Sequence, residues 1–152
     1  MGEITGALYS QTSRLDYSMK VIFLDVDGVL NNSILLYHYG SDFIDEEMTA
    51  LFAQVVKSTG AKVVLSSSWR LEERSKKMVE DALSVYGVKI MDSTPSWLVR
   101  RRDKEISAWL DEHPRVTKYA ILDDNPDAGI GMEGNFFKTD HETGLDAFTA
   151  EA

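Results

Sequence analysis

Residues 21–31 read Val-Ile-Phe-Leu-Asp-Val-Asp-Gly-Val-Leu-Asn and carry the strongest structural signal in the chain. The four apolar residues before Asp25 predict a short buried strand. Side chains two apart on a strand point to the same side, so Asp25 and Asp27 are expected to reach one spot, where Gly28 allows a sharp turn. Crowded carboxylates need a cation or a shared proton, which predicts a divalent-metal site with one Asp as nucleophile and the other as acid and base. The alternative is a polar strand end that caps a turn.

Apolar periodicity continues along the rest of the chain. It predicts further strands over residues 62–65, 88–91, 118–122 and 136–137, and helices over 45–59, 71–86 and 102–112. Asp45 and Gly60 are suited to cap and to end the first of these helices. Residues 31–44 are expected to form a loop. Strands that alternate with helices predict a three-layer α/β fold with a central parallel sheet.

Polar residues follow three of the predicted strands. Asp25 and Asp27 follow the first, Ser66 follows the second, and Asp123 and Asp124 follow the fourth. Ligands of such sheets bind beyond the carboxyl ends of the strands. One polar strand end is easily a turn, but three of this chemistry predict a common site.

The composition sets the class of protein. With 152 residues, 43% of them hydrophobic, the chain is expected to form a single domain over residues 19–152. The absence of cysteine excludes disulfides and a cysteine nucleophile, and fits the cytoplasm. No apolar run reaches the ~18 residues that span a membrane. Residues 1–18 lack the apolar core of a signal peptide and are expected to be poorly ordered, as a leader, an alternative start or an expression remnant.

The net charge of −9 disfavours non-specific binding to nucleic acid. Nine of the sixteen Lys and Arg residues nevertheless fall between Arg70 and Lys104. Arg74, Lys76 and Lys77 are expected on solvated helix faces. Arg70 and the run Arg100–Arg102 are candidates for contacts with anions, although Arg70 could instead pair with an acid.

Four ordered motifs over residues 20–148 resemble the haloacid dehalogenase (HAD) superfamily of aspartate-based phosphohydrolases. They are the Asp-Val-Asp-Gly-Val-Leu run from Asp25, the apolar strand that ends in Ser66, a basic residue at the start of a helix (Arg102 or Lys104), and the Ile-Leu-Asp-Asp run that ends in Asp124.

The resemblance implies a role for each motif. Asp25 would be the nucleophile that becomes phosphorylated, and Asp27 the general acid and base. Ser66 would offer its hydroxyl and its backbone N–H to the phosphoryl group, and Arg102 or Lys104 would be the nearby cation. Mg²⁺ would be bound by Asp25, by the backbone carbonyl of Asp27 and by the acidic pair, with Asp124 favoured over Asp123 as the direct ligand. Substrate contacts are expected from Gly28, Ser67 and Arg70.

Further local sequence motifs narrow the resemblance. The Ser-Ser-Ser-Trp-Arg run from Ser66, the helix from Arg102 and the Gly144-Leu145 tail are similar to small HAD proteins related to domains found with nucleic-acid repair enzymes. Neither gap between the motifs holds the ~50 residues of a separate cap domain. We therefore expect an open, minimally capped, Mg²⁺-dependent phosphatase that acts on phosphorylated nucleic-acid ends or nucleotides. Raised salt is expected to weaken a preference for polymers.

Other functions compete with this one. Phosphotransfer to another acceptor uses the same residues, and an inactive HAD domain could serve as a phosphate-binding module. A receiver domain also phosphorylates an aspartate, but its acidic pair lies on the first strand, which is unlike this chain.

Several aromatic and polar residues have two interpretations. Trp69 could stack on a base or lie in the core, where Trp97 and Trp109 are expected. Tyr37 and Tyr39 could touch substrate or close a flap. Asp127 could support the metal or serve a turn, and the three histidines lack metal-ligand spacing.

Overall fold

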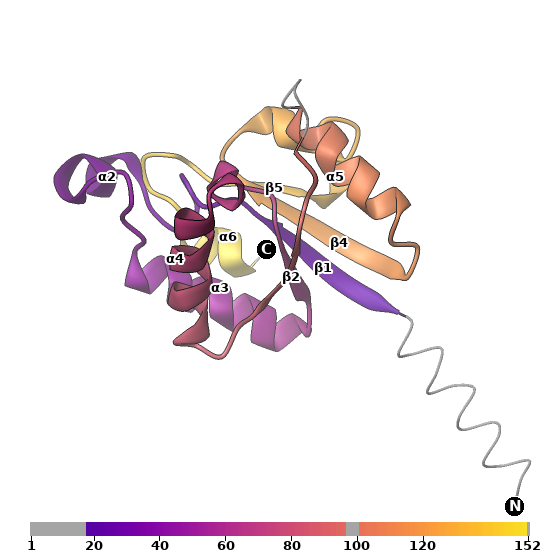
Figure 1. Ribbon diagram of the computed structural model, residues 1–152, viewed down its shortest axis with the longest axis horizontal. Coiled ribbons are helices and arrows are strands. Elements are labelled where there is room, and N and C mark those ends of the chain that lie inside the picture. Colours follow the sequence, from indigo (N-terminus) through magenta and orange to yellow (C-terminus); the bar gives the residue numbers. More distant parts are fainter. Residues whose placement is uncertain (1–17, 97–100, 152) are drawn as a thin grey trace, which may run out of the picture.

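The computed structural model describes residues 18–96 and 101–151, which form a five-stranded parallel sheet flanked by helices (Figure 1). The order in the sheet is β3-β2-β1-β4-β5, so β1 is central and the chain turns in opposite directions on either side of it. Every strand pair is parallel. The predicted α/β class is confirmed. The strands are β1 (Met19–Leu24), β2 (Lys62–Leu65), β3 (Ile90–Ser93), β4 (Val116–Asp123) and β5 (Phe136–Lys138).

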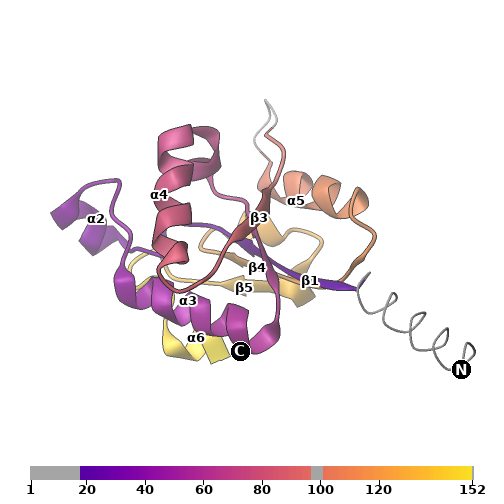
Figure 2. The ribbon, with the colours of Figure 1, turned by 60° about the horizontal axis from the view of Figure 1, so that its bottom comes forward.

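Helices cover both faces of the sheet. The α3 and α4 helices pack on one face, and α5 packs on the other. Figure 2 shows α5 on the opposite side of the sheet from α3 and α6. The α-helices are α2 (Ser33–Tyr39), α3 (Glu46–Thr59), α4 (Glu73–Ser84), α5 (Arg102–Asp111) and α6 (Ala147–Glu151), and short 3₁₀ turns occur at η1 (Ser68–Leu71), η2 (Pro126–Gly129) and η3 (Glu133–Asn135).

The central strand β1 is buried on both faces, as its continuous apolar run predicts. Ile22 and Leu24 belong to the core under α3 and α4. Val21 and Phe23 belong to the core under α5, where the ring of Trp109 lies edge-on to Phe23 at 5.4 Å. Residues of β1 therefore alternate between two cores, and Asp25, next in sequence, continues on the side of Phe23.

The predicted helix over residues 45–59 is confirmed, with both of its predicted ends. The side chain of Asp45 accepts the backbone N–H of Met48, which satisfies a free donor of the first turn. Gly60 ends the helix in the left-handed conformation, which glycine adopts without strain.

Three local predictions differ from the structure. The expected loop over residues 31–44 contains α2, whose seven residues are too few to show an apolar period. The expected helix over residues 71–86 is α4, which begins only at Glu73 because Glu72 is extended and Leu71 ends η1. The third strand lies two residues later than expected. A short edge strand makes few contacts, so its sequence constrains its position weakly.

No separate cap domain interrupts the described residues. Only α2 and α3 lie between β1 and β2, and only η1 and α4 lie between β2 and β3, as the minimal-cap prediction requires. Among the described residues, no helix combines the length and apolar character needed to cross a membrane. The expected leader, residues 1–18, falls outside the described residues except for Ser18.

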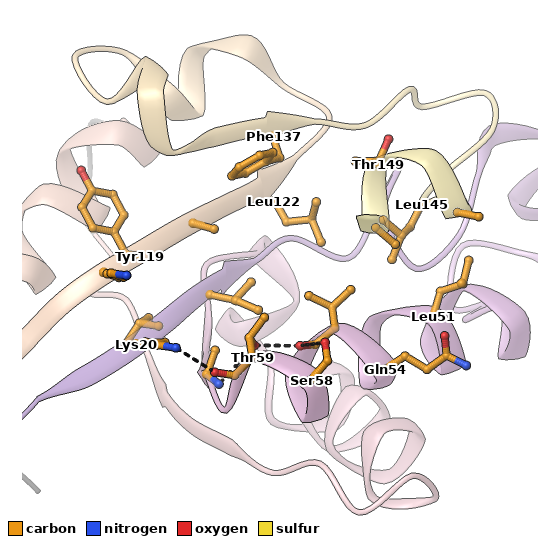
Figure 3. Close-up of a pocket in the computed structure, with 18 residues that line it drawn as sticks. Lys20, Leu51, Gln54, Ser58, Thr59, Tyr119, Leu122, Phe137, Leu145 and Thr149 are labelled. Carbon is orange, nitrogen blue, oxygen red and sulfur yellow. Dashed lines mark hydrogen bonds between the residues drawn. The ribbon is translucent and has the colours of Figure 1, made fainter. Parts of the chain in front are cut away.

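A cavity of about 690 Å³ lies between α3, α6 and the sheet (Figure 3). Its walls include Leu51, Leu122, Phe137 and Leu145. None of the aspartates predicted for catalysis lines it, so the cavity is separate from the polar edge of the sheet.

Candidate active site

The carboxyl edge of the sheet carries a row of polar residues. Asp25, Ser66, Thr94 and Thr139 directly follow the last residues of β1, β2, β3 and β5. The backbone N–H of each donates to a carbonyl of the neighbouring strand at 2.9–3.0 Å, so the sheet pattern extends one residue beyond the strands. This regular ladder aligns the polar side chains where ligands of parallel sheets bind.

The carboxylates of Asp25, Asp123 and Asp124 meet at this edge. One oxygen of each lies within 4.8 Å of the other two. Burial, and then the charge of Asp123, raises the pKa of Asp25 well above its ordinary value, and burial raises the pKa of Asp124. A cluster of buried carboxylates is costly in its charged form unless a cation compensates it. Carboxylate oxygens are also the ligands that Mg²⁺ prefers, so this donor set fits the expected metal.

Arg102, the first residue of α5, is the cation of this cluster. Its Nη1 lies 2.8 Å from Asp123 Oδ2 and 3.3 Å from Asp25 Oδ1. Burial lowers the pKa of Arg102, but the attraction of Asp25 and Asp123 outweighs it, so the pKa is raised. Lys104, two residues along the same helix, is exposed. Of the two basic residues predicted here, the structure brings Arg102 to the acidic cluster and leaves Lys104 at the surface.

The neighbours Asp123 and Asp124 differ in how their carboxylates are engaged. Asp123 Oδ2 accepts from Arg102, and its Oδ1 accepts the backbone N–H of Asn125 at 2.9 Å. Asp123 is thus fixed by the protein on both oxygens, whereas Asp124 is only partly buried. This difference favours Asp124 as the direct metal ligand and Asp123 as the residue that orients Arg102.

Gly28 makes room for Asp124. Its φ is +80°, a conformation that favours glycine, and a Cβ built at this position would overlap the Asp124 carboxylate. The Gly28 N–H donates to Asn31 Oδ1 at 2.9 Å, and its carbonyl accepts the Thr139 hydroxyl at 2.7 Å. The sharp turn predicted at Gly28 is confirmed, and its backbone groups are already bonded within the protein.

Ser66 has a fully buried hydroxyl with no hydrogen-bond partner in the described part of the chain. Thr94, directly after the neighbouring strand β3, has another. Such groups are rare, because desolvating a hydroxyl without a partner costs free energy. The expectation that Ser66 also offers its backbone N–H is wrong, since that N–H donates to the Leu24 carbonyl at 2.9 Å.

Asp27 is held by Asn31, a buried residue for which the sequence predicted no role. Asn31 Nδ2 donates to Asp27 Oδ1 at 3.0 Å and to the Phe43 carbonyl at 3.1 Å. Its Oδ1 accepts the Gly28 N–H. Asn31 therefore connects the Asp27 carboxylate to the turn at Gly28 and to Phe43, which lies beyond the C-terminal end of α2. Its only signal in the sequence is a polar residue directly after an apolar run.

Arg70 is directed into the protein. Its Nε donates to the Thr94 carbonyl at 3.0 Å, its Nη1 to the carbonyls of Ser66 and Ser67, and its Nη2 to the Pro95 carbonyl at 3.1 Å. Its Nη2 also lies 3.1 Å from Oε1 of Glu105, on α5, in a buried ion pair. These contacts account for all five N–H donors of an arginine. Arg70 thus braces the ends of β2 and β3 against α5, and the anion contact expected of it has no free donor.

The other residues expected to contact substrate also form hydrogen bonds or ion pairs within the protein. The Ser67 hydroxyl accepts the N–H of Trp69, and Arg101 forms a paired contact with Asp103 at 3.0 Å. The described arginines of the expected basic cluster therefore each have an acidic partner. Arg100 and Trp97 lie outside the described residues.

Most residues for which the sequence allowed two interpretations have a structural role and not a role in the site. Trp69 and Trp109 are buried, as core positions require. Asp127 is exposed in a turn, where its N–H donates to Asn125. Tyr37 and Tyr39 are exposed. Thr94 was not among the predicted site residues, because the third strand was expected to end two residues earlier than it does.

Comparison with known proteins agrees with this geometry. No curated protein and no solved structure matches the chain. A family model described as the HAD domain in Swiss Army Knife RNA repair proteins matches residues 21–150. That match covers every residue of the polar edge, from Asp25 to Thr139, and most of the chain. The chain therefore belongs to this family of HAD domains.

Proposed function

We propose that the chain is a Mg²⁺-dependent phosphatase that hydrolyses phosphomonoesters through a phosphorylated Asp25. The observation that carries the proposal is the meeting of a carboxylate cluster, a cation and an unpartnered serine hydroxyl at one sheet edge. Phosphoryl transfer needs a positioned nucleophile, positive charge against the phosphate and donors for its oxygens. Mg²⁺ at Asp25 and Asp124 would supply further positive charge when bound.

The proposed reaction has two steps. An oxygen of Asp25 bonds to phosphorus while the bond between phosphorus and the ester oxygen breaks, and Asp27 donates a proton to that oxygen, which leaves as an alcohol. Asp27, now ionised, accepts a proton from water as the water oxygen attacks phosphorus and the bond to Asp25 breaks. The products are the alcohol and inorganic phosphate, and both aspartates return to their starting states.

The neighbouring residues have supporting roles in this proposal. Arg102 opposes the repulsion between the Asp25 carboxylate and the phosphate, and the Ser66 hydroxyl donates to a phosphoryl oxygen. Asn31 is a positioning residue, because its hydrogen bond fixes the direction of the Asp27 carboxyl group. Arg70 supports the strand ends that carry Ser66 and Thr94.

The proposed substrate class is a phosphorylated nucleic-acid end, with nucleotides as smaller substrates. Two observations support it: the family's description names RNA repair proteins, and no separate cap domain lies within the described residues. A site without a cap does not enclose a small molecule, so it gains less from positioning one.

The direct test is release of inorganic phosphate from terminally phosphorylated oligonucleotides and mononucleotides, with Mg²⁺ or with excess chelator. We expect release with Mg²⁺, none in chelator and recovery when Mg²⁺ is restored. Calcium should restore less, because its larger and looser shell misplaces the nucleophile. Undiminished release in excess chelator would rule out the metal, and transfer of phosphate to an acceptor without release would indicate a phosphotransferase.

Asp27→Asn is expected to slow turnover by about 10²–10⁴-fold, the usual contribution of general acid–base catalysis. The loss should be smaller for esters with activated leaving groups, because their oxygen needs no proton in order to leave. Steady-state rates on a series of leaving groups measure this. An equal loss across the series would contradict Asp27 as the general acid.

Arg102→Ala is expected to lower kcat/KM by about 10²-fold, because the nucleophile then faces the phosphate without a nearby cation. Lys104→Ala is the matched control on the same helix and should stay close to the wild-type value, since Lys104 is exposed. Arg102→Lys, which keeps the charge, should recover part of the loss. The reverse ranking of the two alanine variants would assign the cation to Lys104.

A further inference from the structure

The α2 helix, which follows the turn that carries Asp27 and Gly28, exposes apolar and aromatic side chains. None of its residues is buried, and Ile34, Tyr37 and Tyr39 are 60%, 89% and 68% exposed. In Figure 1, α2 lies at the edge of the molecule, outside the layers formed by the sheet and the other helices. Clustered exposed apolar side chains mark interaction surfaces more often than single ones do.

Aromatic rings dominate this surface, which we call the α2 aromatic surface (Tyr37, His38, Tyr39 and Phe43). The rings of Tyr39 and Phe43 are stacked, with centroids 4.7 Å apart and 23° between their planes. The rings of Tyr37 and His38 are nearly perpendicular, with centroids 5.7 Å apart, and Tyr37 is largely exposed to solvent. Each ring of the surface lies within 6.4 Å of the next, from Tyr37 through His38 and Tyr39 to Phe43, and the two tyrosines are exposed. Exposed aromatic rings are the groups on which proteins stack unpaired nucleobases.

Hydrogen bonds join this surface to the proposed catalytic residues. Asn31, at its base, bonds both the Asp27 carboxylate and the carbonyl of Phe43. Asn32 caps α2 by accepting the N–H of Leu35 and also donates to the Thr143 carbonyl at 3.3 Å. Both ends of the segment are therefore fixed, which holds the exposed rings at a defined position relative to Asp27.

The charges near α2 do not favour contacts with a phosphate backbone. Asp42 lies between α2 and α3, Glu46 and Glu47 lie in the first turn of α3, and Arg74 pairs with Asp42 at 3.6 Å. The described arginines of the expected basic cluster also have acidic partners. Among the described residues around α2, base stacking is therefore the contribution to a polymer preference that this surface offers.

We propose that the α2 aromatic surface is a stacking platform for the unpaired bases of a single-stranded nucleic acid whose terminal phosphate lies at Asp25. This inference rests on the proposed function and names the surface that would recognise its polymer substrate. A protein partner is the competing occupant, and self-association through this surface is one of the outcomes measured below. Stacking on this surface by itself depends weakly on salt, and the salt dependence expected from basic contacts stays a separate prediction.

The test compares wild type with Tyr37→Ala/Tyr39→Ala and Tyr37→Phe/Tyr39→Phe double variants. Val85→Ala is the matched control, since Val85 is 74% exposed on another helix end. The first readout is the ratio of kcat/KM for a short terminally phosphorylated oligonucleotide to that for the matching mononucleotide. We expect the alanine double variant to lower this ratio by about 5- to 100-fold, the usual effect of losing base stacking on one ring. The phenylalanine variant and Val85→Ala should retain it.

A second readout does not depend on turnover. A fluorescent base analogue near the phosphorylated end should be quenched when it stacks on wild type and not on the alanine double variant. Unchanged ratio and quenching in that variant would overturn the platform, as would self-association of wild type that the same substitutions abolish. Quenching without phosphate release from any substrate would instead contradict the proposed phosphatase and leave the platform standing.

Discussion

Asp25→Asn is expected to lower phosphatase turnover by roughly 10⁴-fold or more, the scale on which removal of a covalent nucleophile acts. An amide does not attack phosphorus, and the neighbouring carboxylates are differently engaged: Asp123 is bonded to Arg102, and Asp124 is the proposed metal ligand. Phosphate release under saturating Mg²⁺ measures the loss. A second signature is the absence of the phosphorylated protein that wild type should form when the reaction is quenched by acid.

The same substitution is expected to stabilise the metal-free protein by a few degrees at neutral pH. Burial and the charge of Asp123 raise the pKa of Asp25, so the folded state disfavours the charged carboxylate. A raised pKa in the folded state means that stability is lost as the pH rises through it, and asparagine does not ionise. The difference in melting temperature should therefore shrink as the solution is made more acidic.

These two readouts separate catalysis from folding. A variant that melts above wild type in chelator yet fails to turn over has lost chemistry and not structure. Added Mg²⁺ should raise the melting temperature of wild type more than that of Asp25→Asn, because binding to the folded state stabilises it. Wild-type turnover by Asp25→Asn would remove Asp25 from the mechanism.

Gly28→Ala is expected to lower kcat/KM by about 10²-fold or more and to raise the Mg²⁺ concentration needed for activity. The new methyl group would overlap the Asp124 carboxylate, so the proposed ligand must move, and displacements of about 1 Å near reacting groups have effects of this size. Titration of activity with Mg²⁺ measures the shift, and melting with and without Mg²⁺ measures binding apart from turnover.

Gly60→Ala provides the control for backbone strain. Gly60 has a φ of +72°, close to the +80° of Gly28, but a Cβ there meets nothing within 4 Å. Both variants should therefore lose similar stability from the backbone, and only Gly28→Ala should change the Mg²⁺ requirement. An unchanged Mg²⁺ requirement in Gly28→Ala would contradict Asp124 as a ligand.

Much of the fold follows from local patterns in the sequence. The buried strand before Asp25 and the helix between Asp45 and Gly60 are where apolar spacing and capping residues predict them. Both elements bury apolar residues, so the spacing of apolar residues in the sequence reveals them. The α2 helix has seven residues and none is fully buried, so it is too short to show a helical period, and its sequence predicts a loop.

Local patterns also predict that Asp25, Ser66, Asp123 and Asp124 lie at strand ends, and consecutive parallel strands deliver those ends to one edge of the sheet. The partners of these residues do not follow from the same patterns. Arg102 and Lys104 are equivalent by spacing, and only the packing of α5 against the sheet turns the first toward Asp123 and the second to solvent.

Arg70 shows the same limit more clearly. Its sequence position near Ser66 fits a phosphate contact, yet its guanidinium is used by carbonyls from 24 and 25 residues away and by Glu105 on another helix. Strand periodicity, turn residues and helix caps depend on residues that are close together in the sequence, so the sequence alone predicts them. Which charged groups pair depends on how distant elements pack. A buried charge without a partner costs free energy, so each buried group pairs with whatever partner the packing brings to it, and that arrangement exists only once the chain has folded.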